Sequence, residues 1–122
     1  MNCIFCKIIN HEIPSYTIYE DEFVNVFLDI NPDSNGHMLI IPKKHALDIT
    51  EIERETWNHI LDITRNMKSL LEEKLKIDGL TLIQNNGMVQ EVKHFHLHLK
   101  PYYSEGQKLL PVEDIYNKLK EL

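Results

Sequence analysis

One long amphipathic segment constrains the fold of this chain more than any other feature. From Trp57 to Leu75, apolar side chains recur at intervals of three and four residues, which predicts a single long helix with one buried stripe. Thr50 and Glu53 fit a capping box at its start, and Gly79 is expected to end it. The stripe consists of Trp57, Ile60, Leu61, Thr64, Met67, Leu71 and Leu75.

Short segments rich in apolar and β-branched residues lie on both sides of this helix. Three precede it, at residues 16–20, 23–29 and 37–42, and two follow it, at residues 80–84 and 94–100. The first two flank an acidic turn and predict a hairpin. Because the strands do not alternate with helices, their order predicts an α+β fold with a mainly antiparallel sheet.

Two shorter helices and one loop complete the predicted fold. Residues 4–10 are expected to form a short helix, and Pro111 to open a final amphipathic turn or two. Residues 31–36 are six turn-forming residues in succession, which predicts a loop directly before the strand at 37–42.

The size and charge of the chain limit its partners. A length of 122 residues suits one domain, residues 1–122, with a single core. A net charge of −6 disfavours binding of a nucleic-acid polymer, while a small anionic ligand held by a few side chains is still allowed. The longest apolar stretch, Met38–Pro42, is too short to cross a bilayer, and residues 1–15 carry no secretion signal. We therefore expect a cytoplasmic protein that binds neither membrane nor nucleic acid.

Three histidines, His94, His96 and His98, alternate with apolar residues in the last predicted strand. Side chains at i, i+2 and i+4 share one face of a strand, so the imidazoles are expected to lie opposite the core. This face could simply be the exposed side of a half-buried strand. Its two functional interpretations are metal ligation and nucleophilic catalysis, since a neutral imidazole can attack phosphorus and form a phosphoimidazole.

Cys3 and Cys6 are the two cysteines of the chain, and they form a Cys-x-x-Cys pair. Two cysteines make no disulfide framework, and the pair can be read as a zinc ligand pair, as two inert buried thiols or as a redox pair. A tetrahedral zinc site needs two more ligands. His45 and one of the three alternating histidines are the candidates.

The ordered set of motifs resembles a known family. His94–Leu99 matches the His-x-His-x-His-x pattern, with x apolar, of the histidine-triad (HIT) superfamily of nucleotide hydrolases and transferases. The resemblance is greatest to its small zinc-bearing nucleoside phosphoramidase branch, and it covers a core of about residues 3–102 and leaves a tail at 103–122. The further matching segments are Cys3–Ile9, Glu12–Pro14, Tyr19–Asp21, Phe27–Pro32, Gly36–His37 and Ile41–His45.

This resemblance implies an architecture and a set of catalytic residues. It implies a five-stranded antiparallel sheet with one long and two short helices, and a homodimer in which two sheets join into one of ten strands. By position, His96 resembles the nucleophile that accepts the nucleoside monophosphate. His98 resembles the partner that hydrogen-bonds the α-phosphate and assists the leaving group, and His37 resembles the upstream histidine of the same site.

The resemblance also implies the binding residues. The nucleotide is expected to contact an apolar base pocket, a carboxylate at the ribose and amides near the phosphate. These positions are Phe5, Ile8, Phe27, Ile30 and Leu39 for the base, Asp29 for the ribose, and Asn85 and Gln90 for the amides. Cys3, Cys6, His45 and His94 correspond to the ligands of a structural Zn²⁺ ion without an open position. Nothing in the sequence requires Mg²⁺.

The chain departs from the family pattern beside the triad. The segment between the Asn-Gly turn and the triad is two residues shorter than in many relatives, and Glu91 stands where they often carry Ser or Thr. Lys100 replaces an apolar residue, and Lys93 and Lys100 are expected to offset part of the negative charge of Glu91. A carboxylate there either points away or selects a cationic leaving group.

The expected function is therefore hydrolysis or transfer at the α-phosphate of purine nucleoside phosphoramidates or aminoacyl-nucleotides. The proposed intermediate carries the nucleotide on a histidine. Hydrolysis of dinucleoside polyphosphates is one alternative. A catalytically slow nucleotide- and zinc-binding module that acts through partner proteins is another.

Overall fold

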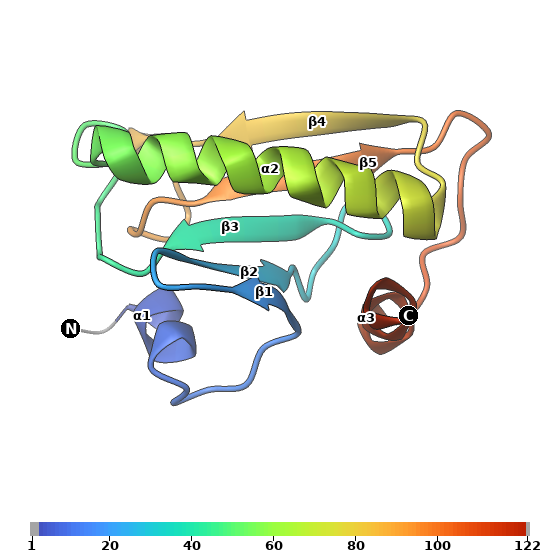
Figure 1. Cartoon of the computed structure of the whole chain (residues 1–122), viewed down its shortest axis with the longest axis horizontal. Helices are drawn as coiled ribbons and strands as arrows, with labels where there is room; N and C mark the ends of the chain where they lie inside the picture. Colours follow the sequence, from blue (N-terminus) through green and yellow to red (C-terminus); the bar gives the residue numbers. More distant parts are fainter. Residues whose placement is uncertain (1–2, 122) are drawn as a thin grey trace.

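The computed structural model describes residues 3–121 and confirms the α+β class. Five strands form one antiparallel sheet in the order β1-β2-β3-β5-β4. The long helix α2 lies across one face of the sheet, and α1 and α3 lie near β1 (Figure 1). The elements are α1 (Ile4–Ile9), β1 (Thr17–Glu20), β2 (Val24–Leu28), β3 (Met38–Pro42), α2 (Arg54–Leu75), β4 (Gly79–Gln84), the 3₁₀ helix η1 (Gly87–Val89), β5 (Leu97–Tyr102) and α3 (Val112–Lys120).

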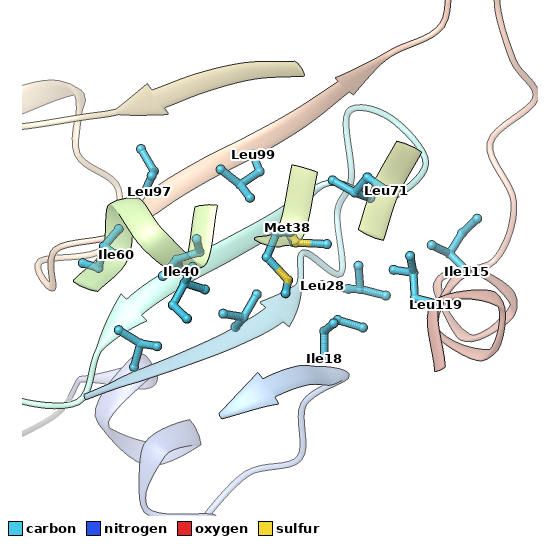
Figure 2. Packing of buried hydrophobic residues seen from close by; sticks show 14 of the residues in the cluster. Ile18, Leu28, Met38, Ile40, Ile60, Leu71, Leu97, Leu99, Ile115 and Leu119 are labelled. Carbon is cyan, nitrogen blue, oxygen red and sulfur yellow. The ribbon is translucent and has the colours of Figure 1, made fainter. Parts of the chain in front are cut away.

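The pleat of the central strands divides the buried residues between two clusters. Successive side chains of a strand point to opposite faces. In β3, Met38 and Ile40 therefore pack under α2, whereas Leu39 and Ile41 pack on the other face with Phe27 of β2. Figure 2 shows the cluster under α2, where helix side chains meet those of β3 and β5. The second face is left for α1 and the functional site.

The buried stripe of α2 has the predicted period of three and four residues, but some of its members differ from the predicted ones. Ile60, Thr64, Met67 and Leu71 are buried as expected. Ile63, which the stripe omits, is 4% exposed, whereas Leu61 is 43% exposed. Trp57 is also exposed by more than a third, although its ring packs edge-on against Phe95. The helix therefore turns a slightly different face to the sheet than the spacing alone suggests.

Both predicted end signals of α2 are wrong. The helix begins at Arg54, after an N-cap Glu53 that makes no side-chain cap bond. The hydroxyl and N–H of Thr50 instead donate to the carboxylate of Asp48. Thr50 therefore does not cap the helix. At the other end Lys76 is the C-cap in the left-handed conformation, with φ of 54°, and Gly79 is the first residue of β4.

The predicted strand at 94–100 is wrong in its first three residues. β5 begins only at Leu97, because the N–H of Phe95 donates to the carbonyl of Ala46, outside the sheet, at 2.7 Å. His94 and His96 therefore precede the strand. The expected alternation still holds, because Phe95, Leu97 and Leu99 lie in the cluster under α2, while the rings of His96 and His98 pack against each other with centroids 4.9 Å apart.

Residues 103–121 pack onto the rest of the chain. Pro111 is the N-cap of α3, and Ile115 and Leu119 of this helix enter the cluster under α2 beside Ile18 and Leu28 (Figure 2). The final amphipathic segment is thus a full helix of nine residues. Among residues 3–121, no helix combines the length and the apolar character that a membrane span requires.

Candidate active site and metal centre

Two adjoining hollows lie on the face of the sheet opposite α2. The polar hollow has a volume of about 330 Å³ and the apolar hollow one of about 270 Å³. Asp29, Asn31, Glu91, His96 and His98 line both. The polar hollow adds Asp33, His37, Asn85 and Lys100. The apolar hollow adds Ile4, Phe5, Ile8, Ile13, Pro14, Ser15, Phe27, Leu28, Ile30, Leu39 and Val92.

The alternation of the strands brings these residues to one face. Leu97 and Leu99 of β5 belong to the cluster under α2, so His98 and Lys100 point the other way. His98 pairs in register with Leu39 of β3, which lines the apolar hollow. The local sequence pattern therefore places a titratable side chain at the boundary between the two hollows.

A backbone carbonyl fixes the proton of His96. The Nδ1 atom of this ring lies 2.8 Å from the carbonyl oxygen of His94. A carbonyl only accepts hydrogen bonds, so Nδ1 carries the proton and Nε2 has a free lone pair in the neutral ring. Burial lowers the pKa of His96 below 6.5, which favours this neutral form. Phe5 packs edge-on against the ring, with centroids 5.1 Å apart.

In His37, a backbone N–H places the proton on the other ring nitrogen, Nε2. The N–H of Asp33 donates to Nδ1 of His37 at 3.1 Å, so the proton of the neutral ring lies on Nε2. That Nε2 atom is 3.0 Å from Nδ1 of His98 and donates to it. His98 then keeps its own proton on Nε2. Burial, with smaller contributions from His96 and His37, lowers the pKa of His98 to about 4.

Asp29, His37 and His98 also bring one potential ligand atom each within 4.8 Å of one another. The Nε2 atom of His37 is 3.6 Å from a carboxylate oxygen of Asp29. A metal at this position would need the lone pair of that Nε2 atom, which is protonated because Nδ1 accepts from Asp33. The two histidines are therefore better arranged to donate hydrogen bonds, and the Asp29 carboxylate to accept them, than the three are to hold a cation.

Cys3, Cys6, His45 and His94 form a second group, here called the metal cluster. The Nδ1 atoms of His45 and His94 lie 3.1 Å apart, and the Sγ atoms of Cys3 and Cys6 lie 3.3 and 3.5 Å from Nδ1 of His94. Nε2 of His94 donates to the carbonyl of Pro42 at 2.8 Å, so its Nδ1 atom presents a bare lone pair to the cluster.

This donor set suits a zinc ion. Tetrahedral bonds of about 2.0–2.3 Å place neighbouring N and S ligands roughly 3.3–3.8 Å apart. The N–S distances, from 3.3 to 3.5 Å, agree with that range, and two cysteines with two histidines are a common structural zinc set. Of the three readings of the cysteine pair, zinc binding fits this geometry, and the four residues of the cluster are the four candidate ligands expected from the sequence.

The charged residues around the polar hollow do not balance. Lys100 pairs with Asp33 at 2.6 Å, and the ammonium of Lys93 donates to the carbonyls of Gly87 and Gln90. Within residues 3–121, neither lysine forms a hydrogen bond or an ion pair with the carboxylate of Glu91, which lines both hollows. An offset of the Glu91 charge by Lys93 and Lys100 would therefore act through space, and it stays a prediction.

Of the residues expected to bind the nucleotide, all but one line the hollows. Gln90 is 3% exposed and donates through Nε2 to the carbonyl of Leu47, and it lines neither hollow. Ile30 lines the apolar hollow but is 71% exposed. Sequence reasoning missed Asn31 and Asp33, although both lie in the turn-forming run between Asp29 and His37 that positions them.

Known proteins are similar to this chain in sequence and in fold. The HIT domain model matches residues 10–105. An uncharacterized HIT-like protein of Methanocaldococcus jannaschii is 43% identical over 118 residues, which cover 94% of this chain and 90% of that protein. Adenosine 5′-monophosphoramidase HNT1 of Saccharomyces cerevisiae is 41% identical over 110 residues, or 88% of this chain and 67% of the enzyme. A zinc-bound histidine triad family protein from Mycobacterium smegmatis matches in structure with a TM-score of 0.89 and 32% identity, over 98% of this chain and 91% of that chain.

Proposed function

Because this chain belongs to the HIT domain family, we propose that it is a nucleotide hydrolase. It cleaves purine nucleoside phosphoramidates or aminoacyl-nucleotides at the α-phosphate, through an intermediate in which the nucleotide is bonded to His96. The observation that carries this proposal is the unprotonated Nε2 of a buried His96 at the boundary of a polar and an apolar hollow. A phosphoramidase among the relatives supports the same class of reaction.

The two hollows suit the two halves of a nucleotide. Phe5, Ile8 and Phe27 give the apolar hollow a surface for a purine ring. Asp29 lines both hollows, where its carboxylate is placed to accept from ribose hydroxyls. The α-phosphate then lies beside His96 in the polar hollow.

The proposed reaction has two displacements at phosphorus. In the first, Nε2 of His96 forms a bond to the α-phosphorus, and the bond to the leaving amine breaks as the amine takes a proton from solvent. The Nε2–H group of His98 donates to a phosphoryl oxygen and stabilises the charge that develops there. Water then attacks phosphorus and gives up a proton to solvent, the electron pair of the P–N bond returns to Nε2 of His96, and the nucleoside monophosphate leaves.

Glu91 favours an amine leaving group over further phosphates. The polar hollow holds the carboxylates of Asp29, Asp33 and Glu91 but only one lysine, Lys100, which is paired with Asp33. A polyphosphate leaving group would bring more negative charge against these carboxylates. The hollow therefore supports a phosphoramidase more than a dinucleoside polyphosphate hydrolase.

We also propose a structural Zn²⁺ at the metal cluster and a homodimer. When bound, the ion would supply four bonds that tie the start of α1 to His45, which follows β3, and to His94, which precedes β5. The ion has no part in the displacement. The edge strand β4 pairs only with β5, and its Leu82 is 50% exposed. β4 is therefore our candidate edge for joining two sheets. Analytical ultracentrifugation tests the dimer, which a purely monomeric protein at micromolar concentration would refute.

Turnover of adenosine 5′-phosphoramidate tests the function. The wild type is expected to release adenosine monophosphate, and His96→Ala to bind the nucleotide without turnover. Wild-type protein that binds adenosine monophosphate but hydrolyses neither phosphoramidate nor diadenosine polyphosphate would instead support the binding-module alternative.

A further inference from the structure

Asn35 lies in the 31–36 loop. All four of its polar groups form hydrogen bonds with the segment that follows β5. Its side-chain Nδ2 donates to the carbonyl of Lys108 and its Oδ1 accepts from the N–H of Leu110, both at 2.9 Å. Its backbone N–H donates to Oε1 of Gln107 at 2.9 Å, and its carbonyl accepts from the hydroxyl of Tyr103 at 2.7 Å. Asn35 is only 8% exposed, so water cannot readily replace these partners.

Three of these partners lie in residues 107–110, beyond the part of the chain that the family model matches. The segment leads directly into α3, whose Ile115 and Leu119 are anchored in the core. It is therefore a fixed support and not a free tail. In the part of the chain that the structure describes, every hydrogen bond between this segment and the 31–36 loop involves Asn35.

The same loop sets the proton of His37. The N–H of Asp33, two residues before Asn35, donates to Nδ1 of His37, two residues after it. The N–H of His37 in turn donates to the carbonyl of Ser34 at 3.1 Å. Gly36 has φ of +91°, and a Cβ there would lie 2.7 Å from Leu75, so the loop is also closely seated against α2. A small shift of the loop would break the bond from Asp33.

We propose that Asn35 is a positioning residue that holds His37 in the tautomer with its proton on Nε2, and that the segment 107–110 acts on the site through it. This proposal rests on the proposed function for its effect on rate. If the bond from Asp33 is lost, His37 can move its proton to Nδ1. Its bare Nε2 would then face the bare Nδ1 of His98, and the ring of His98 would no longer be held toward the phosphate.

The reaction of Asn35→Ala tests this proposal in the full-length protein. We expect kcat for adenosine 5′-phosphoramidate to fall by about ten- to hundredfold, as for a catalytic group displaced by an ångström. KM should change less than about twofold, because the contacts of the apolar hollow are unchanged. Gln107→Ala, which removes one of the four bonds, should give a smaller fall in kcat. Asn58→Ala, an exposed asparagine of α2, is the matched control and should behave as wild type.

Nitrogen-15 NMR of the imidazoles separates positioning from general destabilisation. The wild type should show His37 with its proton on Nε2, and Asn35→Ala should show a mixture of tautomers or the Nδ1 form. Unchanged His37 signals and unchanged kcat in Asn35→Ala would overturn the proposal. An inactive wild type would overturn the proposed function, while the tautomer measurement would still decide the role of Asn35. If Asn35→Ala does not fold, Gln107→Ala and Tyr103→Phe provide the same two measurements.

Discussion

Backbone groups decide which nitrogen of each site histidine carries its proton. The carbonyl of His94 accepts a hydrogen bond from Nδ1–H of His96 and so leaves Nε2 of that ring bare. The N–H of Asp33 donates to Nδ1 of His37, so in this ring Nδ1 is bare and Nε2 carries the proton. The site thus combines one lone pair for attack with one N–H group for stabilisation, without any net charge on the rings. His98 receives its orientation from His37.

Burial of His98 predicts a dependence of stability on pH. The unfolded chain binds a proton at this ring below pH 6.5, and the folded chain only below about pH 4. Between these values the unfolded state holds more protons, so the free energy of unfolding should fall as the pH is lowered from 6.5 toward 4. Urea unfolding at pH 7 and pH 5 measures this loss. It should be smaller in His98→Asn, and equal losses in both proteins would refute the assignment.

The carboxylate of Glu91, which has no ion-pair partner among residues 3–121, predicts a preference for the charge of the leaving group. In Glu91→Gln, kcat/KM for an adenylate of a lysine side chain should fall about fivefold, the effect of roughly 1 kcal/mol of attraction. The rate on diadenosine polyphosphate should rise, since one repulsive charge is removed. Glu55→Gln, an exposed carboxylate of α2, is the control. Equal effects on cationic and anionic leaving groups would contradict the role of Glu91.

At the level of elements, α1 belongs to both the metal cluster and the apolar hollow. Cys3 and Cys6 flank Phe5 on this short helix, and Phe5 and Ile8 line the hollow. A helix of six residues has little stability of its own. Its position must come from packing and from the bonds that a metal would add.

Loss of the metal should therefore weaken nucleotide binding. As-purified protein should hold about one zinc ion per chain. Cys6→Ser should lose it, with a lower Tm and a higher KM for the phosphoramidate, because the wall formed by α1 becomes mobile. Lys7→Ala, exposed on the same helix, should keep both zinc and affinity. Full zinc content in Cys6→Ser would end the metal assignment, and zinc loss with unchanged KM would remove the link to the hollow.

The orientation of α2 predicts which apolar side chain stabilises the sheet. Ile63→Ala, at a position 4% exposed, should lower the free energy of unfolding by about 2–4 kcal/mol. Leu61→Ala, at a position 43% exposed, should cost less than about 1 kcal/mol. Denaturant titration of the two variants makes the comparison, and the reverse order would mean that the helix presents a different face.

Across the whole molecule, periodic patterns could be predicted and long-range pairings could not. The apolar spacing was sufficient to predict α2 and the β1–β2 hairpin, because burial of one face acts on every turn or pleat. The ends of α2 depend on individual residues that the spacing does not identify. Asp48 accepts hydrogen bonds from the N–H and hydroxyl of Thr50, and Lys76 forms the C-cap in the left-handed conformation. The start of β5 depended on a bond from Phe95 to Ala46, which no local pattern records.

The same distinction applies to the site. The four candidate metal ligands lie together in the fold, in the combination that the family resemblance implies. The position of Gln90 could not be predicted, because its amide binds the carbonyl of Leu47, 43 residues away in sequence. Asn35 carried no chemical signal either. Its importance follows from contacts with residues 107–110, which only the folded chain brings near.

Mapping of the covalent intermediate tests the central claim most directly. Protein mixed with adenosine 5′-phosphoramidate and stopped by alkaline denaturant would be digested and examined by tandem mass spectrometry. The bond would be assigned to one ring nitrogen by phosphorus NMR. We predict adenosine monophosphate on Nε2 of His96 in the wild type and no adduct in His96→Ala. Product formation with the adduct on another residue, or with no histidine adduct at any time, would contradict the account.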